Sequence, residues 1–286
     1  MVRRFAEDRW FDWTVNAILV AVSLLVVVPL LYVVSVSLTP YGEVLKNGGY
    51  VFFPKGITFS AYAELLKQGR FPRALGITTA VTVIGTFLSM ILTLLTAYPL
   101  SRKKLPFRNP FLFLVVFTIL FSGGMIPTYL IVKETGLLNS IWAMIIPNAV
   151  SAFFVLLMKS FFQNIPEELF EQAQIDGARE TRVMLQIVMP VSVPVILTIS
   201  LFYAVGRWNE FLQAILYISN RELFPLQVLI REILTASQST ENIEITVPTM
   251  SLQMAAVVLA TIPIVVVYPF IQKHFIKGAM LGSIKG

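Results

Sequence analysis

Few side chains in this sequence could perform covalent chemistry. The 286 residues contain no cysteine and one histidine, His274, which lies in a basic C-terminal segment. A thiol nucleophile, a disulfide and a thiolate metal site are therefore excluded, and we expect no metal site. No G-x-x-x-x-G-K-[ST] phosphate loop occurs either. The chain is expected to bind no cofactor of its own, and in particular no ATP through such a loop.

One group of polar residues interrupts an apolar stretch near the C-terminal third of the chain. Arg207, Trp208, Asn209 and Glu210 follow one another there. If the stretch crosses a membrane, its ionisable side chains are costly and are expected to face a cavity or one another. The i, i+3 spacing allows Arg207 and Glu210 to form a salt bridge. A structural pair near the outer interface and a polar lining of a solute pathway stay equally open.

A longer polar segment, residues 163–190, reads QNIPEELFEQAQIDGARETRVMLQIVMP, and we name it the elbow. Pro166 suits the first turn of a helix, with Asn164 as its cap. Gly177 is typical of a helix that ends in a turn. A second helix is expected from about Arg179, and Pro190 is expected to end it.

The pattern predicts two short amphipathic helices, roughly at right angles, on one face of the membrane. A plain interfacial loop is the alternative. Connections between spans are usually short. This one is long and amphipathic, and it lies on the side of the membrane where basic residues are more frequent. We therefore interpret the elbow as a docking element.

The elements that must position these groups are membrane-spanning helices. The chain is 56% hydrophobic and 13% charged, against roughly 25% charged residues in soluble domains. Six long windows carry no charged residue, and their continuous apolar character excludes a barrel. We predict one all-α transmembrane domain over residues 1–286 with six helices. The predicted spans are about 14–38, 74–100, 110–132, 138–161, 195–218 and 248–272.

Several local features refine this prediction. The first span is too long for the apolar part of a signal peptide and is expected to stay uncleaved. The paired glycines and the proline of SGGMIP, residues 122–127, are expected to weaken or bend the third span. A short amphipathic helix is expected near residues 61–67. No internal repeat supports the plan of many secondary transporters.

The distribution of basic residues predicts the orientation. Loop 102–108 has four basic residues and no acid, and thirteen basic residues in all fall on this side of the membrane against eight on the other. This bias places both termini in the cytoplasm. The net charge of +6 therefore orients the chain in a bilayer, and no nucleic-acid partner is expected.

The elbow resembles the signature of the permease subunits of binding-protein-dependent ABC importers: EAA, three residues, glycine, nine residues, then I-x-L-P. Two positions depart mildly, since Gln172 replaces the middle alanine and Met189 the leucine. The residues of this segment that the resemblance assigns to ATPase coupling are Glu171, Gln172, Ala173, Asp176, Gly177, Ala178, Ile187 and Pro190.

The resemblance covers nearly the whole chain and is greatest to carbohydrate-uptake permeases. The sequence is similar to the second membrane subunit of the maltose importer and to permeases for complex oligosaccharides of the alginate type. The stretches that carry it are GGMIPTYL at 123–130, GLLNSIWAMIIPNAVSAFF at 136–154, WNEF at 208–211, FPLQVLIR at 224–231 and FIKGAMLGSIKG at 275–286.

The resemblance implies a type I ABC importer permease fold whose elbow is a coupling helix seated in a cleft of the ATP-binding subunit. It also implies that the chain lies in the cytoplasmic (inner) membrane of a bacterium. Glu171 would face basic or polar groups there. The implied partners are a second, homologous permease in a heterodimer, two copies of an ABC ATPase that bind ATP and Mg, and an extracytoplasmic solute-binding protein. The binding protein would deliver a sugar or oligosaccharide to external loops such as 39–73 and 219–244. The cytoplasmic tail, 273–286, would contact the ATPase through Lys277, Gly278, Gly282 and Lys285.

The pathway candidates of this subunit are Arg207, Trp208, Asn209 and Glu210. An arginine in the pathway would suit an anionic oligosaccharide, such as an alginate or pectin fragment. The same importer architecture for a non-sugar solute is the main alternative. A secondary transporter or channel is disfavoured because ion coupling would need acidic residues within the membrane, and Glu210 is the only acidic residue in a predicted span. A membrane enzyme is disfavoured because no histidine cluster or obvious acid pair occurs.

Overall fold

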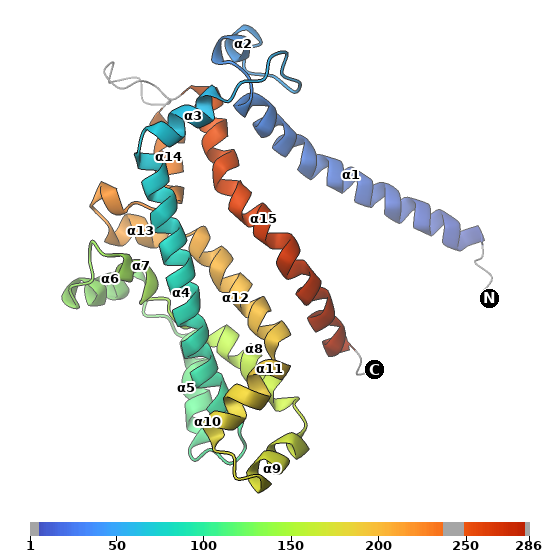
Figure 1. Ribbon diagram of the computed structural model, residues 1–286, viewed down its shortest axis with the longest axis vertical. Coiled ribbons are helices and arrows are strands. Elements are labelled where there is room, and N and C mark those ends of the chain that lie inside the picture. The colour runs from blue at the N-terminus through green and yellow to red at the C-terminus, as the bar shows by residue number, and fades with distance from the viewer. Residues whose placement is uncertain (1–5, 237–248, 284–286) are drawn as a thin grey trace. The chain divides into compact units, whose positions relative to one another are not determined.

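The computed structural model describes residues 6–236 and 249–283, and within these ranges it places side chains for residues 10–236 and 249–269. Every regular element in the described ranges is a helix (Figure 1). The chain divides into two compact units, residues 1–69 with 230–262 and residues 70–229 with 263–286. The all-α class is confirmed for the described residues.

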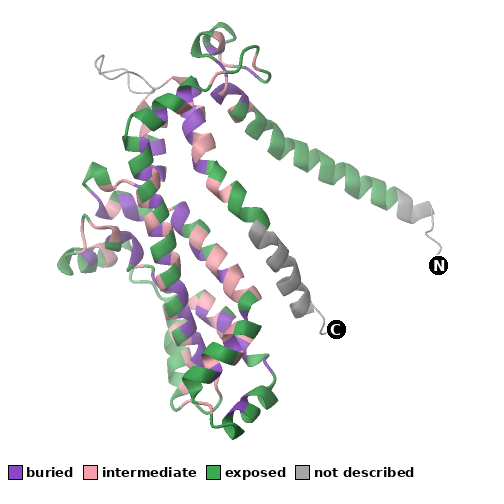
Figure 2. Ribbon diagram, in the orientation of Figure 1, coloured by how far each residue is buried: buried purple, intermediate pink, exposed green. Residues whose placement is uncertain are grey.

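The first unit begins with a long apolar helix, α1 (Ala6–Ser37), followed by α2 (Tyr41–Lys46) and α3 (Ser60–Lys67). The α3 helix confirms the short helix expected near residues 61–67. Residues 10–31 of α1 are exposed (Figure 2). An exposed helix with so apolar a sequence suits lipid rather than water.

The same unit contains the first part of α15 (Met250–Ser283). Val36, Val44 and Val51 form a small core against which Met250 and Met254 pack. The Ser251 hydroxyl donates to the Thr39 carbonyl at 2.9 Å. The start of α15 is therefore held against the end of α1 within this unit.

The second unit is built on α4 (Arg70–Ser101), which packs along α8 (Ala152–Gln163) and α12 (Val193–Trp208). Small residues recur on the buried side of α4 and let neighbouring backbones approach closely. These residues are Ala74, Thr78, Gly85, Ser89, Thr93 and Ala97.

Two predicted spans are interrupted rather than continuous. In the third, α5 (Arg108–Leu120) and α6 (Met125–Glu134) meet at 112°. The bend expected at residues 122–127 is therefore confirmed. In the fourth, α7 (Ile141–Ile145) is separated from α8 by the non-helical residues 146–151, so 138–161 is not one helix. Pro147 in this gap cannot donate to a helical ladder.

The fifth predicted span, 195–218, also differs from expectation because α12 ends at Trp208. Asn209 is the C-cap residue of α12, and its side-chain Nδ2 donates to the Val205 carbonyl at 2.9 Å. The chain continues as α13 (Leu212–Tyr217), a 3₁₀ turn η2 (Arg221–Leu223) and α14 (Leu226–Ala236).

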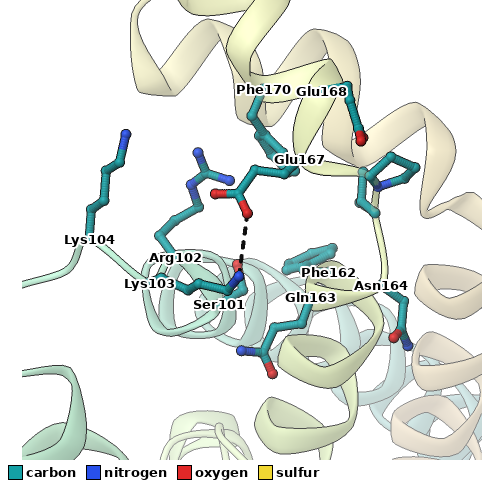
Figure 3. Close-up of a pocket in the computed structure, with 12 residues that line it drawn as sticks. Ser101, Arg102, Lys103, Lys104, Phe162, Gln163, Asn164, Glu167, Glu168 and Phe170 are labelled. Carbon is teal, nitrogen blue, oxygen red and sulfur yellow. Dashed lines mark hydrogen bonds and ion pairs between the residues drawn. The ribbon is translucent and has the colours of Figure 1, made fainter.

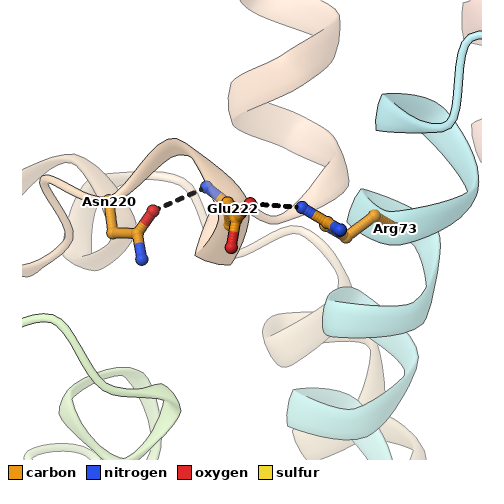
Figure 4. A network of polar contacts seen from close by, with 3 residues as sticks. All are labelled: Arg73, Asn220 and Glu222. Atoms are coloured by element: carbon orange, nitrogen blue, oxygen red, sulfur yellow. Dashed lines mark hydrogen bonds and ion pairs between the residues drawn. The ribbon is translucent and has the colours of Figure 1, made fainter.

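The segment after α13 is tied to the start of α4 by polar contacts. Arg73 and Glu222 form an ion pair at 2.8 Å, and the Asn220 side chain accepts from the Glu222 amide (Figure 4). The Thr78 hydroxyl accepts from the Leu226 amide at 2.7 Å. The ion pair is exposed and contributes about 0–1 kcal/mol, whereas the buried Thr78 contact fixes where α14 begins.

Length and composition identify fewer than six spans directly. Three helices in the described residues are long and apolar enough to cross a membrane: Trp10–Ser37, Arg70–Ser101 and Met250–Pro269. Two bent pairs raise the number to five if each pair is one span: α5 with α6, and Glu180–Val191 with α12, the latter bent by 82°. The α8 helix has 12 residues, too few to cross by itself. Six spans stay a prediction.

Candidate functional site: the elbow between α8 and α12

The first elbow helix, α9 (Glu167–Ile175), follows directly on Pro166. Pro166 occupies the N-cap position, and Asn164 instead ends α8. The expected cap at Asn164 is therefore wrong. The cause is that α8 runs on to Gln163 and leaves only two residues between Asn164 and α9. Glu167 and Glu168 lie in the first turn of α9, where the helix dipole favours acids.

A glycine turn ends α9 as the sequence predicts. Gly177 has φ +73°, a conformation that costs an L-residue roughly 1–2 kcal/mol. The Ala178 amide donates to the Ala173 carbonyl at 2.9 Å, and the Gly177 amide donates to the Gln174 carbonyl at 3.0 Å. These two bonds define a Schellman motif. The turn at Gly177 is thus fixed by backbone geometry.

The second part of the elbow comprises α10 (Glu180–Val183), a π-helical turn η1 (Met184–Val188) and α11 (Met189–Val191). Pro190 does not end this helix as expected, because the break falls at Ser192. The ring of Pro190 clashes with the carbonyl four residues earlier, and the wider π turn lies where that clash is relieved.

The elbow is amphipathic in three dimensions. Its inner face buries Phe170, Ala173, Val183 and Val188 in one cluster with the end of α4, α8 and α12. Its outer face exposes charged, polar and apolar side chains together. The exposed positions of α9 and its turn are Glu167, Glu168, Leu169, Glu171, Gln172, Gln174, Ile175, Asp176 and Gly177.

The signature residues divide between these two faces. Ala173 is buried, and Ala178 and Ile187 are half-buried, so these three support the fold of the elbow. Glu171, Gln172, Asp176 and Pro190 are exposed. The Ile175 side chain is 85% exposed, and it lies between the exposed Gln174 and Asp176 in the chain.

The loop after α4 lies against the beginning of the elbow (Figure 3). The Arg102 guanidinium lies 3.8 Å above the ring of Phe170, a contact worth about 0.5–2 kcal/mol. Lys103 and Glu167 approach to 3.4 Å. Because both side chains are exposed, this pair contributes about 0–1 kcal/mol. An open cavity of about 430 Å³ lies between the loop and the segment that joins α8 to α9.

The hydroxyl of Tyr98, near the end of α4, donates to a carboxylate oxygen of Glu180 in α10. Sequence reasoning missed this contact, because 82 residues separate the two partners and no periodicity relates them. It likewise treated Arg102 and Lys103 only as signals of membrane orientation.

The buried Arg207 reaches from α12 to the end of α7. Its guanidinium donates to the carbonyls of Met144 at 2.5 Å, Ile145 at 3.0 Å and Asn148 at 2.8 Å, and to the Ser89 hydroxyl at 3.3 Å. The last carbonyls of a helix have no partner within the helix, and cations are favoured beside them. Arg207 therefore caps α7 within the second unit.

Tyr203, one helical turn before Arg207, binds the other end of the non-helical segment between α7 and α8. The Tyr203 hydroxyl accepts from the Ser151 amide at 3.0 Å and bonds to the Thr93 hydroxyl at 2.8 Å. Together Tyr203 and Arg207 satisfy backbone groups at both ends of residues 146–151. Non-helical backbone is tolerated at membrane depth only where such partners or a water-filled cavity exist.

The remaining pathway candidates are placed differently from one another. Trp208 is buried, Glu210 is half-buried and Asn209 is exposed. The ion pair that the spacing allowed between Arg207 and Glu210 is absent from the salt bridges of the described residues. The Glu210 carboxylate instead accepts from the Gln213 amide at 3.2 Å.

The predicted tail contacts are described only in part. Helix α15 continues to Ser283, so the backbone of Lys277, Gly278 and Gly282 is helical. Lys285 lies outside the described residues.

The fold and the elbow belong to a known class of membrane protein. Residues 3–280 match the family of binding-protein-dependent transport system inner membrane components, and the chain belongs to this family. It is therefore a permease subunit of an ABC importer and not an enzyme.

Several relatives are similar over their full length. The polygalacturonan/rhamnogalacturonan transport system permease protein YtcP of Bacillus subtilis (strain 168) is 44% identical, over 98% of this chain and 100% of the relative. Protein LplC of the same organism is 42% identical, over 97% and 96%. A bacterial ABC transporter involved in the import of the acidic polysaccharide alginate includes a chain with 31% identity and a TM-score of 0.87, covering 96% of this chain and 100% of that one.

Proposed function

We propose that this chain is one of two different permease subunits in an importer for acidic oligosaccharides, driven by two copies of an ABC ATPase. The family implies an ATPase and an extracytoplasmic binding protein as partners. The ATPase subunits would bind ATP and Mg, and this chain would form half of the translocation pathway. Six spans with both termini in the cytoplasm would place the elbow on the ATPase side.

The exposed face of α9 is the observation that carries the docking role. Its inner residues are buried and its end is fixed by a Schellman turn, so it presents an ordered surface. The same helix exposes the carboxylates of Glu168 and Glu171 and the apolar side chains of Leu169 and Ile175. Such a surface suits a cleft with an apolar floor and basic or polar walls. The tail residues Lys277, Gly278, Gly282 and Lys285 would add a second contact to the ATPase.

The proposal of an acidic solute rests on the relatives rather than on Arg207. The name of the relative YtcP specifies polygalacturonan and rhamnogalacturonan, and the related importer is described as one for the acidic polysaccharide alginate. The charge of Arg207 is buried against main-chain oxygens, so the suggestion that Arg207 itself binds an anion loses its support. Of the pathway candidates, the exposed Asn209 and the half-buried Glu210 are better placed than Trp208 to meet a solute.

The experiment uses the importer reconstituted with its ATPase, second permease and binding protein. We expect oligogalacturonides to stimulate ATP hydrolysis and neutral maltooligosaccharides not to do so. Replacing Gly177 by valine should abolish the stimulation, because a β-branched residue opposes φ +73°. Asparagine, which tolerates this conformation, is the matched substitution of similar size and should retain more of the stimulation.

Two results would contradict the proposal, each in a different part. Full stimulation in the Gly177→Val variant would exclude the docking role of the elbow. Equal stimulation by neutral and acidic oligosaccharides in the unmodified importer would exclude the acidic solute but leave the docking role intact.

A further inference from the structure

The cytoplasmic end of α4 and the loop after it contact the elbow on both sides of Gly177. We propose that Tyr98, Arg102 and Lys103, here named the α4 clamp, are positioning residues that make α4 move with the elbow. This inference rests on the proposed docking of the elbow to an ATPase. It gives the basic loop a mechanical role in addition to membrane orientation.

The contact on the α10 side is made by Tyr98. Its ring is buried and lies edge-on to Phe162 with centroids 6.3 Å apart, which fixes the direction of the hydroxyl. The hydroxyl reaches Glu180, the first residue of α10. A hydrogen bond to a carboxylate is stronger than a neutral one. Helix α10 is therefore joined directly to α4.

The contacts on the α9 side are made by Arg102 and Lys103. The planar guanidinium of Arg102 lies over Phe170, which is itself buried on the inner face of α9. Lys103 adds a weaker, exposed ion pair with Glu167 in the first turn of the same helix. Both elbow helices are thus attached to the same end of α4, one on each side of the glycine turn.

The charges at the two helix ends fit this arrangement. Basic residues follow the C-terminus of α4, where the helix dipole favours positive charge. Acidic residues begin α9, where the dipole favours negative charge. The Arg108 side chain donates to the Leu100 carbonyl at 2.9 Å and holds the last turn of α4. The last turn of α4 is therefore also held by a contact that does not involve the elbow.

The far end of α4 is also attached within the same unit. Thr78 holds the start of α14, and α12 packs along the length of α4. A displacement of the elbow that pulls on α4 would therefore reach α12 and the residues after α13. Without the clamp, the elbow would be linked to α4 through apolar packing alone, which allows sliding more readily than directed hydrogen bonds.

The test measures oligogalacturonide uptake per ATP hydrolysed by the complete importer in proteoliposomes. Tyr98→Phe removes one hydroxyl, and Arg102→Leu removes the guanidinium. We expect each variant to lower the ratio, on the order of tenfold for Tyr98→Phe, because a hydrogen bond to a charged group is lost. Lys104→Gln is the matched control. Lys104 lies in the same loop but apart from Glu167 and Phe170 in Figure 3, and its variant should keep the original ratio.

Unchanged ratios in the Tyr98 and Arg102 variants would overturn the clamp, as would an equal fall in Lys104→Gln, which would point to the charge of the loop. Co-purification of the ATPase reports assembly separately. If Arg102→Leu does not assemble, the one-atom change in Tyr98→Phe decides the question. Failure of the proposed function itself would be seen in the unmodified importer, as a lack of bound ATPase or of uptake.

Discussion

Arg207 shows how one charged side chain is accommodated inside an apolar bundle. Its hydrogen bonds end on three carbonyls and one hydroxyl rather than on a carboxylate. Removing such a group would leave several buried acceptors unpaired, at about 1–3 kcal/mol each. Gly85 of α4 makes room for it, because a Cβ there would lie 3.1 Å from Arg207 Nε and 3.3 Å from Cδ.

Replacing Gly85 by alanine is therefore expected to destabilise the permease. Alanine usually stabilises a helix by about 1 kcal/mol relative to glycine, but here Arg207 is held by its hydrogen bonds and cannot move aside. We expect overpacking to cost about 1–3 kcal/mol. The measurement is the thermal midpoint of the purified importer.

Gly76→Ala in the same helix is the control. A Cβ at Gly76 meets nothing within 4 Å, so this variant should keep or raise the midpoint. A Gly85→Ala midpoint as high as that of Gly76→Ala would show that Arg207 has a freer position than the structure gives it.

At the scale of elements, the breaks in helices are as important as the helices. The bend between α5 and α6 depends on Gly124, whose φ of 89° and ψ of 174° are accessible essentially only to glycine. The gap between α7 and α8 depends instead on Tyr203 and Arg207 of another helix. One break is encoded locally and the other by distant partners.

The local break can be tested by exchanging the two adjacent glycines for alanine. Gly124→Ala should lower stability by about 1–3 kcal/mol because it forces an L-residue into a strained conformation. Gly123 is not among the glycines with positive φ, and a Cβ there would meet only Pro127 at 4.0 Å. Gly123→Ala should therefore change the denaturation midpoint little. Equal effects would mean that side-chain volume, not backbone conformation, decides the bend.

At the scale of the whole molecule, the open question is how many times the chain crosses the membrane. Six spans require the loop after α4 and the turn after α13 to lie on opposite sides. If the bent pair α5–α6 re-entered on the same side instead, the number of crossings between them would change from odd to even.

The lack of cysteine in the chain makes this directly measurable. We expect Lys104→Cys to react with a membrane-impermeant maleimide only in inside-out vesicles. Arg221→Cys, whose residue is exposed in the turn after α13, should react only in right-side-out vesicles. Reaction of both from the same side would contradict the six-span topology.

The sequence alone determined the all-helical membrane class, the position of the elbow and the glycine turn within it. These features are local, since a charge-free window or a glycine at a helix end is visible within a few residues. The family signature is also local, because its fixed spacing lies within the elbow. Gly177 and Ala173 occupy the positions that the signature requires.

Only the tertiary structure decided where the helices of the fourth and fifth apolar windows break and what the charged residues bind. Composition treats residues 138–161 as uniform, whereas the gap at 146–151 exists because Tyr203 and Arg207 supply its missing hydrogen bonds. The absence of the Arg207–Glu210 ion pair that the spacing allowed and the missed Tyr98–Glu180 contact have the same explanation. A buried polar group takes the partners that packing brings to it, and these come from segments far away in the chain.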